Sequence, residues 1–161
     1  MLRYFKNFKK YAFRLELLQE YKVDGEKKDF EDFLKTGKIK KEYNDEEYLI
    51  IKNAKDRNAS MSRVHVFELP LTDYLKFEFK MYKFNELAGE KIFLLDKLDF
   101  EKINSNINFD FWLFDDKIVL KMNYDKEGRF LGFEEIRTDL RKFIELKDKL
   151  LSISKALKSI S

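Results

Sequence analysis

The sequence predicts an α/β (or α+β) domain in which a mixed β-sheet of about five strands, with a C-terminal β-meander, is covered by helices. Three observations support this fold class. Arg63–Leu69 is rich in β-branched and aromatic residues and is closed by Pro70, as a strand would be. Residues 109–134 contain three strand-like runs separated by two short polar turns. Residues 138–158 instead repeat apolar side chains at three- and four-residue spacing, which predicts a helix.

The N-terminal part of the chain is expected to be helical. In residues 3–20 the apolar side chains recur at helical spacing and the basic ones fall between them, which predicts one amphipathic helix. A second helix is expected over 27–36, where Gly37 provides a stop. Asn44 or Asp45 can cap a third helix, because two glutamates follow in its first turn.

The middle of the chain is expected to form the sheet. Thr72 can cap a helix over 73–84, and Lys91–Leu95 reads as the next strand. A helix between two strands predicts a parallel crossover. The meander strands and the start of the last helix are expected at Phe109–Phe114, Lys117–Tyr124, Arg129–Glu134, and Thr138 or Asp139. The whole chain, 1–161, is expected to be one domain, with a helical part (1–58), a sheet-forming part (62–136) and a C-terminal helix (138–158).

The composition excludes several chemistries. The chain of 161 residues has no cysteine, so disulfides, zinc–thiolate sites and cysteine nucleophiles are ruled out. No stretch approaches the roughly 18 apolar residues of a membrane span, and no signal-peptide core is present, so a cytoplasmic location without membrane contact is expected. The 33 basic and 30 acidic residues are interspersed, which does not favour a dedicated nucleic-acid binder.

A series of short segments resembles a known family. These are Phe13–Glu16, Arg63–Pro70 (RVHVFELP), Leu71–Glu78 (LTDYLKFE), Ala88–Glu90, Asp110–Asp116 (DFWLFDD), Asn123–Asp125 and Gly128–Gly132. In this order they resemble the DUF6879 family, over most of residues 12–134. His65 and Leu69 depart from the usual run before Pro70, and the outer helices here are lysine-rich. The family is a bacterial domain of unknown function, so the resemblance implies no activity.

A second resemblance concerns the fold alone. The order of strands and the Phe-x-x-Phe-Asp-Asp hairpin are similar to those of the phospholipase-D-like domain. Catalytic members of that group carry a His-x-Lys motif, whereas Val66 and Phe67 follow the single histidine, His65, here. The resemblance therefore implies a degenerate member without phosphodiester chemistry.

Charged side chains near Pro70 form the candidate ligand site. Acids and arginines around the end of a strand in an α/β sheet can bind a small polar ligand or a metal ion. The candidates are Arg14, Glu16, Arg63, His65, Glu68, Asp73, Tyr74 and Glu78. The favoured alternative is that these acids and arginines form fixed ion pairs with a structural role. One role for His65 is that of a general base near Ser60 or Ser62. The favoured alternative is a half-buried packing residue with one hydrogen bond.

The region around the Asp115-Asp116 turn supplies further candidates. Asp110, Asp115 and Asp116 carry oxygens of the kind that hard cations bind, but a hairpin turn favours aspartate for backbone reasons alone, so no metal site is predicted. Trp112 is either buried in a central strand or, if exposed, a recognition residue. The simpler interpretation is that the aromatic side chains of residues 109–114, Trp112 among them, are buried on both faces of the strand.

These observations favour a small, non-enzymatic binding or regulatory protein that acts through a protein partner and needs no cofactor. A role in defence or in a mobile element, such as that of a phage-encoded inhibitor, is compatible with its size. One alternative is a hydrolase or transferase that uses the acid–arginine cluster, with Mg²⁺ as an option. The other is a nucleic-acid-binding regulator whose contacts come from Arg3, Lys6, Lys9 and Lys10. The sequence does not disclose the ligand, the partner or the oligomeric state.

Overall fold

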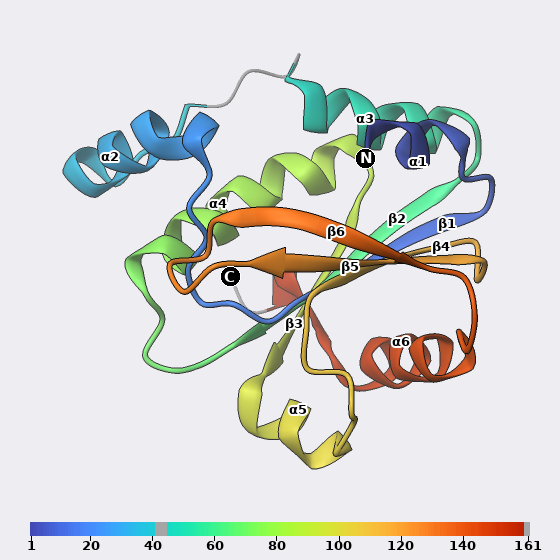
Figure 1. Cartoon of the computed structure of the whole chain (residues 1–161). Helices are drawn as coiled ribbons and strands as arrows, with labels where there is room; N and C mark the ends of the chain where they lie inside the picture. Colours follow the sequence, from blue (N-terminus) through green and yellow to red (C-terminus); the bar gives the residue numbers. More distant parts are fainter. Residues whose placement is uncertain (41–44, 160–161) are drawn as a thin grey trace.

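The computed structural model describes residues 1–40 and 45–159, which fold around one twisted sheet of seven strands (Figure 1). Across the sheet the strand order is β6-β5-β4-β1-β2-β3-β7. The strands are β1 (Tyr11–Glu16), β2 (Ser60–Phe67), β3 (Lys91–Asp96), β4 (Phe111–Phe114), β5 (Ile118–Tyr124), β6 (Phe130–Ile136) and β7 (Lys155–Ala156). The predicted fold class, a mixed sheet covered by helices, is confirmed, although the sheet has two strands more than the five expected.

Helices cover both faces of the sheet (Figure 1). One face, called the α4 face below, lies under α1 (Leu2–Asn7), α3 (Glu46–Asp56) and α4 (Asp73–Ala88), with α2 (Lys27–Thr36) beside α4. The opposite face, called the α6 face, lies under α5 (Lys97–Ile103) and α6 (Arg141–Ile153). Two short 3-10 turns, η1 (Asp24–Glu26) and η2 (Leu157–Ser159), complete the described elements.

The connections in the sheet agree with the predicted topology. Strands β1, β2 and β3 are parallel, and α4 forms the predicted crossover between β2 and β3. The predicted meander is present, because β4, β5 and β6 pair in antiparallel order. Since β4 also pairs antiparallel with β1, the meander extends the parallel half of the sheet into one mixed sheet.

The prediction of a single helix over 3–20 is wrong. Helix α1 ends at Asn7, and Tyr11–Glu16 is the central strand β1, hydrogen-bonded to β2 on one side and β4 on the other. The last five residues of this strand are all buried, so both of its faces contact protein. A strand buried on both faces has no solvent side to reveal its two-residue period, and its apolar residues then also fit a helical spacing.

The C-terminal helix is shorter than predicted. It begins at Arg141 after Leu140, without a side-chain cap from Thr138 or Asp139, and it ends at Ile153. The chain then pairs with β3 as the two-residue strand β7. Helix α5 had no counterpart among the predicted elements.

Three other helix ends agree with the predictions, whereas α4 continues to Ala88, beyond the expected end at 84. Gly37 ends α2 in the left-handed conformation (φ 68°), where a residue with a side chain would be strained. The carboxylate of Asp45 accepts the Tyr48 amide, and the Thr72 hydroxyl accepts the Leu75 amide, so both residues cap the helices that follow them. Asn44, the alternative cap of α3, lies outside the described residues.

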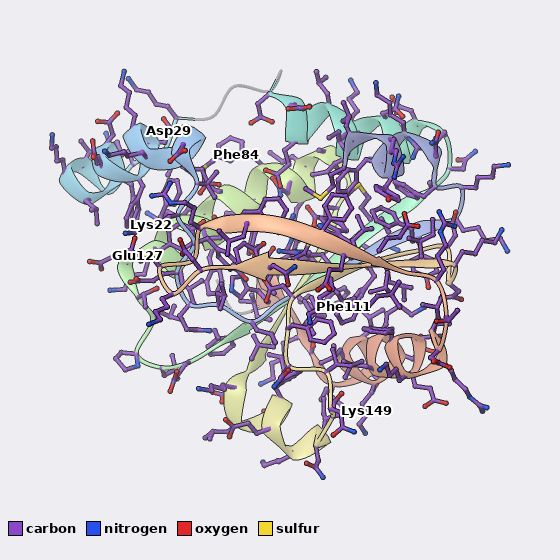
Figure 2. All side chains as sticks on the ribbon, viewed as in Figure 1. Lys22, Asp29, Phe84, Phe111, Glu127 and Lys149 are labelled. Atoms are coloured by element: carbon purple, nitrogen blue, oxygen red, sulfur yellow. The ribbon has the colours of Figure 1, made fainter. Side chains whose placement is uncertain are left out.

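The α6 face of the sheet is an apolar core. Phe13, Leu15, Val64 and Phe111 point toward it and are fully buried. Helix α6 completes this core, where the Phe111 and Phe143 ring centroids lie 5.2 Å apart; Figure 2 marks Phe111 between the sheet and α6. The α4 face is different, because charged side chains are buried beneath its helices.

Candidate functional site

Four ionisable side chains lie together on the α4 face, on two neighbouring strands. Arg14 of β1 pairs in register with Arg63 of β2, and Glu16 pairs with His65. Alternate residues of a strand point to the same face, so all four project toward α4. They are buried, with exposed fractions of 5, 7, 5 and 0% for Arg14, Arg63, Glu16 and His65. We call these side chains and the groups that they contact the ionic network.

Arg63 holds three carboxylates. Its Nη1 lies 2.5 Å from Glu16 Oε1, its Nε 2.8 Å from Glu90 Oε1, and its Nη2 3.3 Å from Glu47 Oε1. The Asn85 side chain donates to Glu90 and Glu47 as well. Burial by itself raises the pKa of Glu16, but the positive charge of Arg63, with a smaller contribution from Arg14, lowers it to about 2. Glu16 is therefore ionised throughout the ordinary pH range.

Arg14 contacts the other end of the network. Its Nη2 donates to the Tyr124 hydroxyl at 2.7 Å and to Asp110 Oδ2 at 3.3 Å, and its guanidinium lies 5.6 Å from the Trp112 ring centre. Its Nη1 is buried and has no hydrogen-bond partner in the part of the chain that the structure describes. Burial by itself would lower the pKa of Arg14, but Tyr124, Asp110 and Glu16 raise it above its ordinary value.

Asp110 fixes the chain at the end of β1. Its carboxylate accepts the Leu17 amide at 2.9 Å and the Tyr21 hydroxyl at 2.5 Å, in addition to Arg14. Burial raises the pKa of Asp110, although the charge of Arg14 opposes this shift. All of these contacts are made within the fold, so Asp110 has a structural role.

His65 is held as a neutral imidazole. Its Nε2 lies 2.8 Å from the Leu18 carbonyl oxygen, which can only accept, so Nε2 carries the proton. Its Nδ1 then accepts from the Tyr82 hydroxyl at 2.7 Å. Burial lowers the pKa of His65, against the influence of Glu16, so Arg63 and not His65 supplies the positive charge beside Glu16 at neutral pH.

The expected environment of His65 needs two corrections. The residue is completely buried rather than half-buried, and both of its ring nitrogens are hydrogen-bonded rather than one. Ser60 and Ser62 differ from His65 by an odd number of positions in the same strand, so they point to the opposite face. His65 therefore does not face either serine as a general base.

Helix α4 adds a further acid, Glu78, to the network. The Tyr74 hydroxyl lies 3.2 Å from Glu78 Oε2 and 3.0 Å from Glu26 Oε2. Burial, together with the negative charges of Glu26 and Glu16, raises the pKa of Glu78 well above its ordinary value. A protonated Glu78 can donate to the Tyr74 oxygen while Tyr74 donates to Glu26, which satisfies all three groups.

Two of the residues predicted beside Pro70 lie outside the network. Glu68 follows the end of β2 and pairs with Lys97 at the surface, and Asp73 begins α4 and pairs with Lys76. Their side chains are 57 and 69% exposed. The network therefore lies beneath α4 and not around Pro70, because β2 ends before Glu68 and the first turn of α4 points Asp73 outward.

Several members of the network were not predicted. Two of them, Tyr82 and Asn85, continue a polar stripe on α4 at helical spacing that begins with the predicted Tyr74 and Glu78. A stripe of this kind would ordinarily be assigned to the solvent side. The remaining members that sequence reasoning missed are Tyr21, Glu26, Glu47, Glu90 and Tyr124.

The Asp115-Asp116 turn has a backbone role. Both residues have positive φ values (51° and 57°), as a two-residue hairpin turn requires. The Asp115 carboxylate accepts the amides of Lys9, Lys10 and Tyr11 and so joins the turn to the start of β1. Within residues 1–40 and 45–159, no three acidic or histidine side chains are grouped in a way that could hold a metal ion.

The predicted burial of Trp112 is confirmed. It lies in β4, between β1 and β5, and is 8% exposed. Its ring stacks on Phe114 and meets Phe5 edge to face. Trp112 therefore belongs to the core and is not an exposed recognition residue.

Two open hollows of about 440 Å³ each lie at opposite ends of β6. The first, called the α2 groove, is lined by the chain after β1, by η1 and α2, by Tyr74 and by Arg129, which precedes β6. The second, called the basic pocket, is lined by α1, the β4–β5 turn and Arg137, which follows β6. Of the four basic residues predicted to contact phosphates, Arg3 and Lys9 line this pocket, whereas Lys6 and Lys10 are exposed outside its lining.

The family model for DUF6879, a domain of unknown function, matches residues 1–157 of the chain. The chain belongs to the DUF6879 family. The match extends beyond the segments that carried the resemblance, from α1 through β7 in the structure. The ionic network of this DUF6879 protein is therefore built from residues within the family domain. No curated protein matches the sequence. Over the described part of this DUF6879 chain, none of the helices has the length and apolar character needed to cross a membrane.

Proposed function

We propose that this DUF6879 protein is a non-enzymatic binding protein whose α2 groove docks a segment of a partner protein. The segment would present a few apolar side chains together with a lysine or an arginine. The observation that carries the proposal is a concave surface in which exposed apolar side chains are surrounded by an excess of acids.

The apolar part of the α2 groove is open to solvent. Val23 and Leu34 are 48 and 53% exposed, and both line the groove. Phe130, the first residue of β6 after the groove-lining Arg129, is 41% exposed. Apolar side chains gathered on a concave surface are typical of protein interaction sites.

Both walls of the α2 groove are joined to other elements of the fold. Phe30 of α2 packs on Tyr74 and Phe77 of α4, with ring centroids 5.6 and 5.3 Å apart. On the other wall, Lys22 bonds the β5–β6 turn through Glu127 at 2.9 Å; Figure 2 labels these two side chains next to each other. A partner segment would therefore meet a preformed surface, which lowers the entropic cost of binding.

Charge favours a basic partner. Four acids line the groove, Glu20, Asp24, Glu26 and Glu31, against three basic residues. Two of the basic residues already contact carboxylates, since Arg129 pairs with Asp24 at 3.1 Å and Lys22 pairs with Glu127. The electrostatic potential over the apolar side chains is thus expected to be negative, which complements a lysine or an arginine at the rim.

The ionic network supports the binding proposal over the hydrolase or transferase. The candidate catalytic groups Arg14, Glu16 and Arg63 are at most 7% exposed and are bonded to one another or to other side chains. A substrate would have to break these contacts to reach them, at a cost of several kcal/mol. The groups that line the α2 groove need no such change.

Affinity capture with two matched double variants tests the proposal. The protein and its V23D/L34D variant would each be used as bait in lysate of the organism that encodes the chain, with mass spectrometry as the readout. A partner captured by the wild type is expected to be lost from V23D/L34D, and its purified form to bind this variant at least about tenfold more weakly.

The control is L87D/L98D, because Leu87 and Leu98 are 65 and 68% exposed and neither lines the α2 groove. This variant adds the same charge and is expected to retain the partner. Equal capture by V23D/L34D and the wild type, or equal loss in both variants, would contradict docking in the groove. Thermal unfolding of each bait confirms that it is folded.

A further inference from the structure

The basic pocket gathers much of the net charge of the chain. Arg3, Lys9, Lys117 and Arg137 line it against two acids, Asp115 and Glu135, which leaves a local net charge of +2. The whole chain carries only +3. These side chains come from three separate segments, and the fold brings α1, the β4–β5 turn and the end of β6 to the same end of the sheet (Figure 1).

Neither acid in the basic pocket neutralises its lysines. The Asp115 oxygens lie 2.7 Å from the amides of Lys9 and Lys10, so this carboxylate binds backbone groups. Glu135 accepts the Tyr4 hydroxyl and Arg137 Nε. Among the described residues, Lys9 and Lys117 form no ion pair within 4.0 Å. Two ammonium groups are therefore available to an anionic ligand.

The floor of the basic pocket is apolar and well packed. Tyr4, Phe8 and Phe114 form it, with exposed fractions of 6, 4 and 3%. The Phe114 ring centroid lies 5.8 Å from that of Tyr4 and 5.9 Å from that of Phe8. These rings give the pocket an apolar floor on which a flat aromatic group can lie.

Among anions, phosphate groups fit this arrangement. Two free ammonium groups and two guanidinium groups around a single hollow suit the several oxygens and the multiple charge of a phosphate ester. A volume of about 440 Å³ is within the range of small-ligand sites and accommodates more than a phosphate ion alone. The apolar floor then suits the base of a nucleotide.

We infer that the basic pocket binds the phosphate groups of a nucleotide, either free or within a nucleic-acid strand. Lys9 and Lys117 contact the phosphates, with Arg3 and Arg137 at the rim. This inference is independent of the α2 groove and adds a second binding site at the other end of β6.

Equilibrium binding of four probes tests the inference. The probes are inorganic phosphate, fluorescently labelled ADP, a labelled single-stranded 12-nucleotide DNA and a labelled octaglutamate peptide, each titrated at 50 and 300 mM salt. ADP or the oligonucleotide is expected to bind, and to bind on the order of tenfold more weakly at the higher salt. Binding of ADP identifies a free nucleotide as the ligand, and binding of the oligonucleotide alone identifies a strand.

Charge-reversal variants locate the binding site. K9E/K117E is expected to lower the affinity at least about tenfold. K28E/K149E, which makes the same change in net charge at two exposed lysines outside the pocket, is expected to bind within about twofold of the wild type. Figure 2 labels Lys149 on α6. Unchanged melting temperatures confirm that both variants are folded.

Three outcomes overturn the inference. They are the absence of binding to ADP and to the oligonucleotide at 50 mM salt, an equal loss of affinity in both variants, and octaglutamate binding as tight as that of the phosphate probes. The last result would show a site for acidic groups in general rather than for phosphate.

Discussion

Both faces of the central sheet are buried, but apolar packing stabilises one of them, and ion pairs and hydrogen bonds stabilise the other. On β1 and β2 the residues facing α6 are Phe13, Leu15, Val64 and Val66, whereas those facing α4 are Arg14, Glu16, Arg63 and His65. Charge therefore alternates with apolar side chains along two strands that have no solvent side. An alternating pattern of charged and apolar side chains therefore marks a solvent-exposed strand face only when no helix covers the charged side.

Arg63→Met is expected to have the largest effect on this comparison. It removes the cation shared by Glu16 and Glu90 and leaves two buried carboxylates without that partner. The free energy of unfolding should fall by about 3–5 kcal/mol. Urea unfolding at pH 7 measures the change. A loss below about 1 kcal/mol would mean that the α4 face does not depend on its ion pairs.

Leu150→Ala tests how much the apolar core on the α6 face contributes to stability. Leu150 of α6 is fully buried, and the substitution removes its side chain and leaves a cavity. A loss of about 3 kcal/mol in the free energy of unfolding is expected. Because no charge is involved, this loss should be the same at pH 5 and pH 8. A loss that varied with pH would show that the two faces are coupled.

Glu16 should make the α4 face sensitive to acid. Its pKa is about 2 in the fold, because Arg63 outweighs the effect of burial, and its ordinary value is 4.5. The stability that this lowered pKa provides is complete above pH 4.5 and is lost as the pH falls from 4.5 toward 2, by up to about 3 kcal/mol. Carboxyl ¹³C shifts measured by NMR should show Glu16 still ionised at pH 3.5. Titration of Glu16 near pH 4.5 would refute this account of the pair.

Glu78 is expected to give the free energy of unfolding a pH dependence opposite to that of Glu16, and its effect should be the smallest. Burial raises its pKa, so the folded protein loses stability as the pH rises from 4.5 toward that raised value. Glu78→Gln carries no charge and should raise the free energy of unfolding at pH 8, with no gain below pH 4.5. Glu101→Gln, at an exposed position on α5, is the control and should have no effect. A destabilising Glu78→Gln would indicate an ionised Glu78.

The elements with local signals were predictable from the sequence. Helix α2 ends at Gly37, α4 is capped by Thr72, and β2 and β3 flank α4, because caps, stops and β-branched runs act within a few residues. The fold class followed from these elements, and the family followed from short segments such as RVHVFELP and DFWLFDD. The resemblance to the phospholipase-D-like domain stays a prediction.

The site was less predictable, because its residues meet only through the tertiary fold. Arg14, Glu16, Arg63 and Glu78 were named in advance, but the network also includes Glu90 and Asn85, whose polar character suggests exposure. The identification of β1 failed for a related reason, since the apolar side chains of residues 3–20 also fit a helical spacing, with Arg14 among the basic residues that fall between them. Burial of charge depends on a partner that is distant in sequence, and a local pattern does not contain it.

Hydrogen exchange measured on the protein alone and bound to its captured partner tests the central claim most directly. The account predicts new amide protection in residues 20–34 and 129–131, the segments around the α2 groove, with β1 and β2 unchanged. Protection gained instead at Arg14, Arg63 or the helix over them, with residues 20–34 unaffected, would contradict it. The ionic network would then be the functional site.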